Sequence, residues 1–330
     1  IDFETPLAEL IRDTRKVLGI PGRGFSTTWQ TRNLSSEKLI PELQRLHQVL
    51  IEPIADLLPN DPTETVTFIP QDMLFFTPFA ALQDRSGNFL IEKHTPVTAP
   101  SIQFLALTAA RQQQLNTLSK ATKALVVGNP TMPQVTLGLN DLPEQLPTLP
   151  GAELEADAIA SLLRTTPLIG ADATETAVVN QLPNARIVHF ATHGLLDDIY
   201  GFQSALAFTP GAGEDGLLKT REIINLDLQA DLVVLSACDT GRGRLTGDGV
   251  IGLARSFIGA GVPSIVVSLW AIPDAPTAEL MTEFYQQLEQ GQTKAEALRQ
   301  AMLKTLETHP DPRNWAGFSL IGEADFSVRF

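Results

Sequence analysis

Arg186-Ile187-Val188-His189-Phe190-Ala191-Thr192-His193-Gly194 is an apolar, β-branched run that stops at a histidine followed by a glycine. A second run, Asp231-Leu232-Val233-Val234-Leu235-Ser236-Ala237-Cys238-Asp239-Thr240-Gly241, stops at the single cysteine of the chain. Each run predicts a strand buried on both faces, because apolar residues follow one another without alternation and turn-forming residues close the run. His193 and Cys238 therefore stand at the carboxyl ends of strands, where open α/β sheets build their sites. Side by side, they would make a nucleophile and its base.

The sequence around these two runs alternates between strand and helix patterns. Lys123–Pro130 predicts a core strand, Ala152–Arg164 predicts an amphipathic helix, and Thr174 is placed to cap the helix before the histidine run. The proline-rich stretch 131–151 predicts an irregular, exposed loop. This alternation indicates a mostly parallel sheet flanked by helices, the α/β class.

The N-terminal part of the chain has a different pattern. Residues 1–60 are mostly helical in period, and Thr65–Pro70 and Phe89–Thr98 predict strands, with Ser101 as the cap of a following helix. No histidine in this part stands at a strand end before a glycine. We therefore predict an N-terminal helical and α+β non-catalytic region, 1–120, and a catalytic domain, 121–330.

Hydrophobic content and net charge restrict which kind of protein this chain can be and which partners it can bind. The chain has 330 residues, 43% of them hydrophobic, and a net charge of −14. It lacks an apolar run of the roughly 18 residues that a membrane span needs, and its first residues do not form a signal peptide. These features predict a soluble, cytoplasmic protein, and a start without methionine suggests a piece of a longer one. The acidity argues against a nucleic-acid partner. It would attract a basic partner, but its simpler role is to keep the protein soluble.

Other kinds of site have little support in the sequence. Gly241–Gly249 has the wrong spacing for a dinucleotide loop, no P-loop lysine follows a glycine there, and the chain contains no Gly-x-Ser-x-Gly elbow. His189 and His193 are four residues apart, but on an extended strand they do not converge on one metal ion. One cysteine is also too few for a structural zinc site. We expect no metal and no cofactor, and we interpret His189 as a core histidine.

A resemblance to a known family rests on several blocks taken together. The chain resembles the caspase-like cysteine peptidases of clan CD, which include caspases, metacaspases, gingipains and separase. It is most similar to the CHAT domain, which often accompanies tetratricopeptide repeats in bacteria. The blocks that carry the resemblance, over roughly residues 40 to 323, are Phe68–Pro70, Thr77–Leu82, His189–Gly194, Leu235–Gly241, Gly249–Arg255, Ser268–Trp270 with Asp274, and Trp315–Phe318.

The resemblance implies roles for individual residues. Cys238 would be the nucleophile and His193 the residue that activates it, and the backbone amides of Gly194 and Cys238 would form the oxyanion hole. In caspases the strand after the nucleophile strand pairs with the substrate. Here that segment contains Ser268, Leu269 and Trp270.

The residue preferred before the scissile bond stays open. Asp239 and Asp274 are the candidates for a pocket that accepts lysine or arginine. Metacaspases have an aspartate two positions before the nucleophile, but this chain has Ser236, which leaves a neutral residue possible. The loop 241–249 contains Arg242 and Arg244, and self-cleavage there is a hypothesis.

Two functions follow from these observations. The first is a cysteine endopeptidase that cleaves a protein or peptide through a Cys–His dyad and is regulated by a tetratricopeptide-repeat domain or a partner protein. The second is a catalytically silent interaction module of the same fold.

Overall fold

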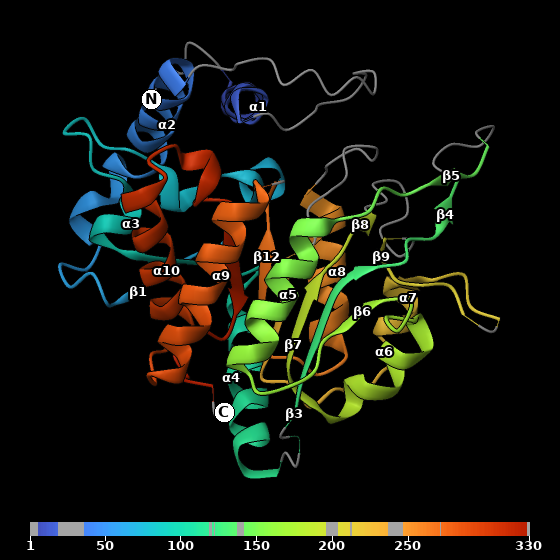
Figure 1. Cartoon of the computed structure of the whole chain (residues 1–330). Helices are drawn as coiled ribbons and strands as arrows, with labels where there is room; N and C mark the ends of the chain where they lie inside the picture. The colour runs from blue at the N-terminus through green and yellow to red at the C-terminus, as the bar shows by residue number, and fades with distance from the viewer. Residues whose placement is uncertain are drawn as a thin grey trace.

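The computed structural model describes residues 6–18, 36–118, 121, 123–136, 142–195, 204–211, 213–236, 247–270 and 272–328. Its centre is an eight-stranded sheet in the order β1-β2-β13-β12-β11-β7-β3-β6 (Figure 1). Every neighbouring pair is parallel except β12 and β13, which are antiparallel. The strands are β1 (Thr65–Phe68), β2 (Thr95–Thr98), β13 (Phe318–Gly322), β12 (Ser264–Ser268), β11 (Leu232–Leu235), β7 (Ala185–Ala191), β3 (Lys123–Pro130) and β6 (Leu168–Gly170).

Helices cover both faces of this sheet. On one face Val126, Ile187 and Val234 pack in a core cluster with α5 (Pro150–Leu162), α9 (Asp274–Glu289) and α10 (Lys294–Thr308). On the other face Val127, Val188 and Val233 pack with α6 (Glu175–Gln181), α7 (Thr220–Ile223) and α8 (Gly247–Gly259). Successive residues of β3, β7 and β11 thus enter opposite cores, which is why these runs show no alternation of apolar and polar residues. The predicted fold class is confirmed.

The remaining elements surround this layered centre. They are the helices α1 (Leu7–Val17), α2 (Ser36–Leu50), α3 (Leu90–Lys93) and α4 (Ile102–Leu118), the strands β4 (Gln134–Val135), β5 (Glu144–Gln145), β8 (Gly194–Leu195), β9 (Ala205–Ala207) and β10 (Leu217–Lys219), and the 3-10 turns η1 (Glu52–Leu57), η2 (Asp72–Phe76), η3 (Phe79–Ala81), η4 (Leu182–Asn184) and η6 (Pro312–Asn314). Strands β10, β9 and β8 form a small antiparallel sheet, and β4 pairs with β5.

Two local predictions were wrong. The strand expected over Phe89–Thr98 begins with the short helix α3, because the Glu92 carboxylate accepts the Phe89 amide at 2.6 Å and closes a helical turn. The stretch 131–151 is not simply an exposed loop in its described part. It contains the β4–β5 pair, and Met132, Val135 and Leu146 form a small buried cluster with Ala207.

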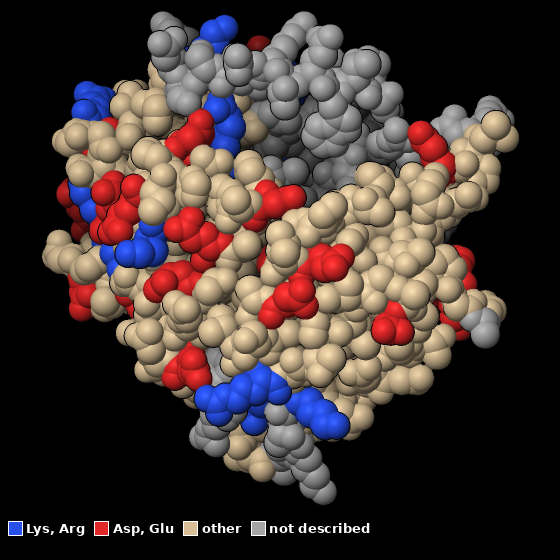
Figure 2. All heavy atoms as spheres, viewed as in Figure 1, with Lys and Arg blue, Asp and Glu red and all other residues tan. Residues whose placement is uncertain are grey.

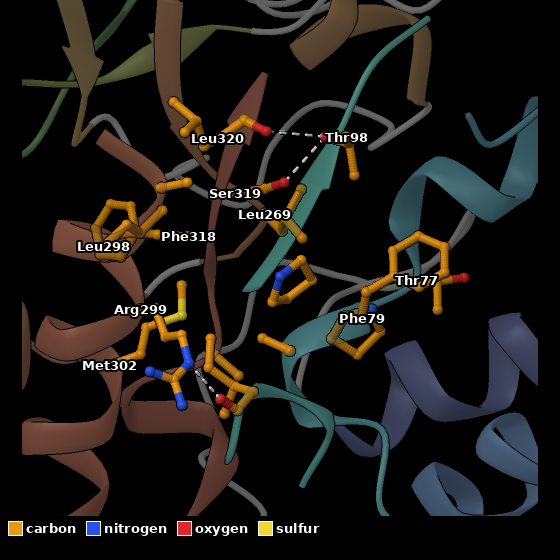
Figure 3. Close-up of a pocket in the computed structure, with 16 residues that line it drawn as sticks. Thr77, Phe79, Thr98, Leu269, Leu298, Arg299, Met302, Phe318, Ser319 and Leu320 are labelled. Atoms are coloured by element: carbon orange, nitrogen blue, oxygen red, sulfur yellow. Dashed lines mark hydrogen bonds between the residues drawn. The ribbon is translucent and has the colours of Figure 1, made fainter. Parts of the chain in front are cut away.

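The sheet continues across the predicted boundary at residue 120, through the pairing of β2 with β13. The bridge there is Ile321 with Thr98, and the Thr98 hydroxyl lies 3.1 Å from that of Ser319 (Figure 3). Beside this seam is a narrow pocket with a cavity volume of about 20 Å³, lined from the other side by α10 residues such as Leu298, Arg299 and Met302. The domain boundary itself stays a prediction.

The face of the molecule drawn in Figure 2 carries charges of both signs. Acidic side chains are spread over it, and basic side chains lie at the lower margin and at the left and top of the view. Within the described part of the chain, no helix combines the length and the apolar character that crossing a bilayer requires.

Candidate active site

The two strands that carry the predicted reactive residues are direct neighbours. Strand β7 pairs with β11 in parallel, with Phe190 opposite Leu235. His193 follows Phe190 by three residues, and Cys238 follows Leu235 by three residues. Cys238 and Asp239 lie outside the described residues. The predicted base and the predicted nucleophile thus follow adjacent strands. Each is three residues beyond the same pair of opposite residues.

His193 is buried directly after β7, with 1% of its surface exposed. Its Nε2 lies 2.7 Å from the carbonyl oxygen of Pro147, which precedes α5. A carbonyl oxygen can only accept, so Nε2 carries the proton and the neutral ring presents the lone pair of Nδ1. Among the described residues Nδ1 has no hydrogen-bond partner. The ring is thus fixed at one nitrogen and has an unused acceptor at the other.

Burial sets the charge state of this histidine. The low polarity around the ring lowers the pKa of His193 below its usual 6.5, against a smaller opposing effect of the Pro147 carbonyl. The neutral form therefore predominates near neutral pH. A neutral imidazole with a free nitrogen can accept a proton from a thiol, which is what a base in nucleophilic catalysis must do.

The amide of Gly194 is directed away from its strand partner. Gly194 faces Leu206 in the antiparallel β8–β9 pair, and the flanking bond runs from Ala207 N to His193 O at 2.9 Å. A bond in that position marks Gly194–Leu206 as a non-hydrogen-bonded pair, in which the N–H groups point outward from the ladder. The Gly194 N–H is thus oriented as an oxyanion donor must be, outside the ladder.

Ser236 and Ser268 are buried at the ends of β11 and β12. Ser236 is 7% exposed, and its hydroxyl has no hydrogen-bond partner among the described residues. Ser268 is the last residue of β12 and is equally buried. Backbone groups alternate along a strand, and the Leu269 amide donates to Gly317 O on the β13 side at 2.6 Å. The backbone of Ser268 therefore faces the β11 side.

The other predicted substrate residues have structural contacts. Leu269 lines the pocket at the β2–β13 seam (Figure 3). Trp270 is buried, and its indole N–H donates to the Arg313 carbonyl at 3.0 Å. Asp274 is exposed at the start of α9, and its carboxylate lies so close to Gly151 that a Cβ added there would come within 2.1 Å of it. These contacts hold the Ser268–Asp274 region against β13 and α5.

His189, interpreted as a core histidine, has both ring nitrogens occupied. Its Nε2 lies 3.1 Å from Glu155 Oε1 of α5, and its Nδ1 lies 3.1 Å from the Tyr285 hydroxyl of α9. The interpretation is confirmed. His189 joins two helices to β7, whereas His193, four residues later, keeps one nitrogen unpartnered.

Sequence reasoning missed Pro147 as a member of this site. Its contribution is a backbone carbonyl, which every residue has, so no residue type or spacing could have indicated it. The nearest signal was the position of the proline-rich stretch directly before a helix that covers the histidine strand.

A family model and several relatives match this architecture. The model of the CHAT domain matches residues 41–323. The chain belongs to the CHAT domain family. Two curated relatives, both called tetratricopeptide repeat protein 28, are 30% identical in Mus musculus and 31% identical in Homo sapiens, each over 86% of this chain. This CHAT domain spans only 13% of the length of those relatives. They are mammalian, and a bacterial source stays a prediction.

Solved structures of caspase-like peptidases share the fold. The Arg-specific cysteine proteinase gingipain R has a TM-score of 0.52 at 15% identity, covering 88% of this chain and 68% of that one. The Saccharomyces cerevisiae separase–securin complex has a TM-score of 0.50 at 12% identity, covering 97% of this chain and 23% of that one. At these identities the likeness shows the fold alone. The predicted caspase-like fold is confirmed.

Proposed function

We propose that this CHAT domain is a cysteine endopeptidase in which Cys238 is the nucleophile and His193 is its base. The observation that carries the proposal is the state of His193. It is buried and neutral, it is fixed through Nε2 by the Pro147 carbonyl, and its Nδ1 has no partner among the described residues. His189, by contrast, has a partner at both ring nitrogens.

The proposed reaction follows general cysteine peptidase chemistry. Nδ1 of His193 accepts the proton of the Cys238 thiol, and the thiolate attacks the scissile carbonyl. The outward-facing amide of Gly194 and the amide of Cys238 donate to the developing oxyanion, each worth about 3 kcal/mol. The protonated imidazole then gives its proton to the leaving amine, and water releases the acyl group from sulfur by the same steps in reverse.

Substrate binding is proposed at the end of β12. The segment Ser268–Trp270 would pair with an extended peptide, as the strand after the nucleophile strand does in caspases. The proposed pocket residues are Ser236, whose buried hydroxyl has no partner among the described residues, and Asp239 and Asp274 for a basic side chain. Regulation by a repeat domain or partner protein is proposed because the relatives are named for tetratricopeptide repeats and are far longer than this domain.

Labelling of Cys238 by an electrophilic peptide tests the proposal. The chain contains one cysteine, so the intact mass reports the modification of that residue alone. We expect His193→Ala to slow labelling by about a hundredfold or more, because general base catalysis is lost. His309→Ala is the matched control, since His309 pairs with Glu279 on α9 and is not part of the proposed dyad, and we expect it to label like the wild type.

A peptide-library screen then separates the two functions that the sequence left open. Cleavage after a defined residue, lost in Cys238→Ala, supports the peptidase. Equally slow labelling of wild type and His193→Ala, without cleavage in the presence of repeat-containing partners, would establish the silent interaction module instead.

A further inference from the structure

The segment that presents the Pro147 carbonyl to His193 is held from outside the site. Residues Leu146 and Leu149 flank it on either side. The Leu146 amide donates to Pro133 O at 3.2 Å, and the Leu149 amide donates to the side-chain oxygen of Asn129 at 2.7 Å. The first bond joins two strands of the same hairpin, whereas the second reaches the end of β3, which is part of the central sheet. Asn129 is therefore the link between the sheet and this segment.

Asn129 uses both ends of its carboxamide. While Oδ1 accepts the Leu149 amide, Nδ2 donates to Glu153 Oε2 in the first turn of α5 at 2.9 Å. Leu149 is the N-cap residue of α5, and its carbonyl accepts the amides of Ala152 and Glu153. One side chain thus fixes the residue that starts α5 and the first turn of that helix.

The backbone at Asn129 is in an unusual conformation. Its φ is +43°, in the left-handed region that residues other than glycine rarely adopt, and Pro130 further restricts it. The register between β3 and β6 shifts at this point. Asparagine tolerates the left-handed region better than most residues, but the strain must be compensated by the surroundings. Here the two carboxamide bonds provide that compensation.

The neighbouring contact leaves little freedom for α5 to move. A Cβ added to Gly128 would lie 2.4 Å from the Cβ of Ala156 and 2.5 Å from the carbonyl oxygen of Ala152. The end of β3 therefore touches the backbone of α5. Because this contact holds the body of the helix, the Asn129 carboxamide is needed only for the segment before it, which contains Pro147.

We infer that Asn129 is a positioning residue for His193. By holding the Leu149 amide, it keeps the Pro147 carbonyl against Nε2 of the imidazole and so maintains the tautomer in which Nδ1 is free. The catalytic role in this inference rests on the proposed function. The tautomer of His193, however, can be measured without any substrate.

The experiment compares Asn129→Gly with the double variant Asn129→Asp/Glu153→Gln in the full chain. Glycine adopts a φ of +43° without strain and removes the carboxamide. The double variant keeps an oxygen for the Leu149 amide, and its glutamine amide replaces the Glu153 carboxylate that would repel an aspartate. Long-range proton–nitrogen NMR of chains labelled with ¹⁵N-histidine reports the tautomer of His193, and the His193→Gln spectrum assigns its signals. Glu153→Gln, which keeps the oxygen that accepts from Asn129, is the control.

We expect wild type, Asn129→Asp/Glu153→Gln and Glu153→Gln to show a single tautomer protonated at Nε2. We expect Asn129→Gly to show a mixture of tautomers and a labelling rate of Cys238 that is lower by about ten- to a hundredfold, because the base is no longer held in place. An unchanged tautomer in Asn129→Gly overturns the inference. Equal disturbance in Asn129→Asp/Glu153→Gln overturns it too, since this variant keeps the acceptor for the Leu149 amide without the repulsion.

Failure of a variant to fold and failure of the proposed peptidase activity can both be told apart from failure of this inference. If Asn129→Gly fails to fold, Asn129→Ala removes the same bonds by another route, and an unchanged tautomer in the folded alanine variant overturns the inference. If wild type shows the expected tautomer but never reacts at Cys238, the proposed peptidase fails while the positioning role of Asn129 stands.

Discussion

The two sides of the central sheet on which its parallel strands begin and end differ in how their buried polar groups are partnered. We call the side where these strands begin the amino edge and the side where they end the carboxyl edge. At the edge where β12 begins and β13 ends, Lys294 is fully buried, and its ammonium lies 2.6 Å from Glu323 and 2.7 Å from the Ser264 hydroxyl. At the same edge, Asp231 pairs with Arg186 at 2.6 Å. At the carboxyl edge, His193 Nδ1 and Ser236 Oγ are buried without a partner among the described residues.

This difference separates structural from functional polarity. A buried ionic group with all its partners stabilises the fold only as long as every partner is present. A buried polar atom without a partner costs free energy in the resting protein, and it persists where it has a role that the resting structure does not display. Ion pairs thus stabilise the amino edge, whereas we propose that His193 and Ser236 at the carboxyl edge meet a substrate.

The largest effect should come from breaking the ion pair of the amino edge. Lys294→Ala leaves Glu323 buried without its counter-charge, and we expect the free energy of unfolding in urea to fall by about 3–5 kcal/mol. The labelling rate of Cys238 in the remaining folded molecules should not change. Combining Lys294→Met with Glu323→Gln should restore most of the loss. A loss below about 1 kcal/mol in Lys294→Ala would mean that the amino edge is not the structural one.

Two serines give a matched test of the same comparison. The Ser264 hydroxyl donates to the Glu323 carbonyl at 2.6 Å and accepts from Lys294 at 2.7 Å, whereas Ser236 has no partner among the described residues. We expect Ser264→Ala to lower the free energy of unfolding by about 2 kcal/mol and Ser236→Ala to change it by less than about 0.5 kcal/mol. Equal losses would contradict the distinction between the edges.

The smallest effect is the pH dependence that His193 contributes. Its pKa is lowered by burial in the folded protein, so below pH 6.5 the unfolded chain binds the proton more readily than the folded one. The contribution to stability is complete above pH 6.5 and is lost as the pH falls toward the folded pKa, with a slope of at most about 1.4 kcal/mol per pH unit.

His193→Gln isolates this contribution, because burial also lowers the pKa values of His47 and His94. The difference in unfolding free energy between wild type and His193→Gln should vary between pH 6.5 and 5 and stay constant above pH 7. If the two proteins show parallel pH curves throughout, His193 does not titrate as its burial requires.

Much of the fold could be predicted from the sequence, because burial leaves a direct trace there. The apolar runs of β7 and β11 indicated strands covered on both sides, and Thr174 and Ser101 indicated helix starts, since each hydroxyl accepts an amide of the first turn. The strand expected over Phe89–Thr98 is present only as Thr95–Thr98, because a single carboxylate, Glu92, closes a helical turn before it.

Of the candidate site, only the side chains could be predicted from the sequence. His193 and Ser236 stand where the strand ends were expected, and Cys238 and Asp239 lie outside the described residues. The contributions of Pro147 and Asn129 were not predictable, because a carbonyl and a left-handed backbone depend on how segments distant in sequence meet. The assignments of Trp270 and Asp274 to substrate binding stay predictions, now with structural contacts beside them.

The sequence by itself determined that two buried strand runs end in a histidine and a cysteine. It also determined that helices cover the sheet that these strands form. Both could be predicted because buried strands and amphipathic helices place apolar residues in regular patterns along the chain. Only the tertiary structure decided the partners of two neighbouring histidines. His189 and His193 have the same side chain four residues apart. Among the described residues, His189 contacts a carboxylate of α5 and a phenol of α9, whereas His193 contacts a single carbonyl of the segment before α5, and all three come from elsewhere in the chain.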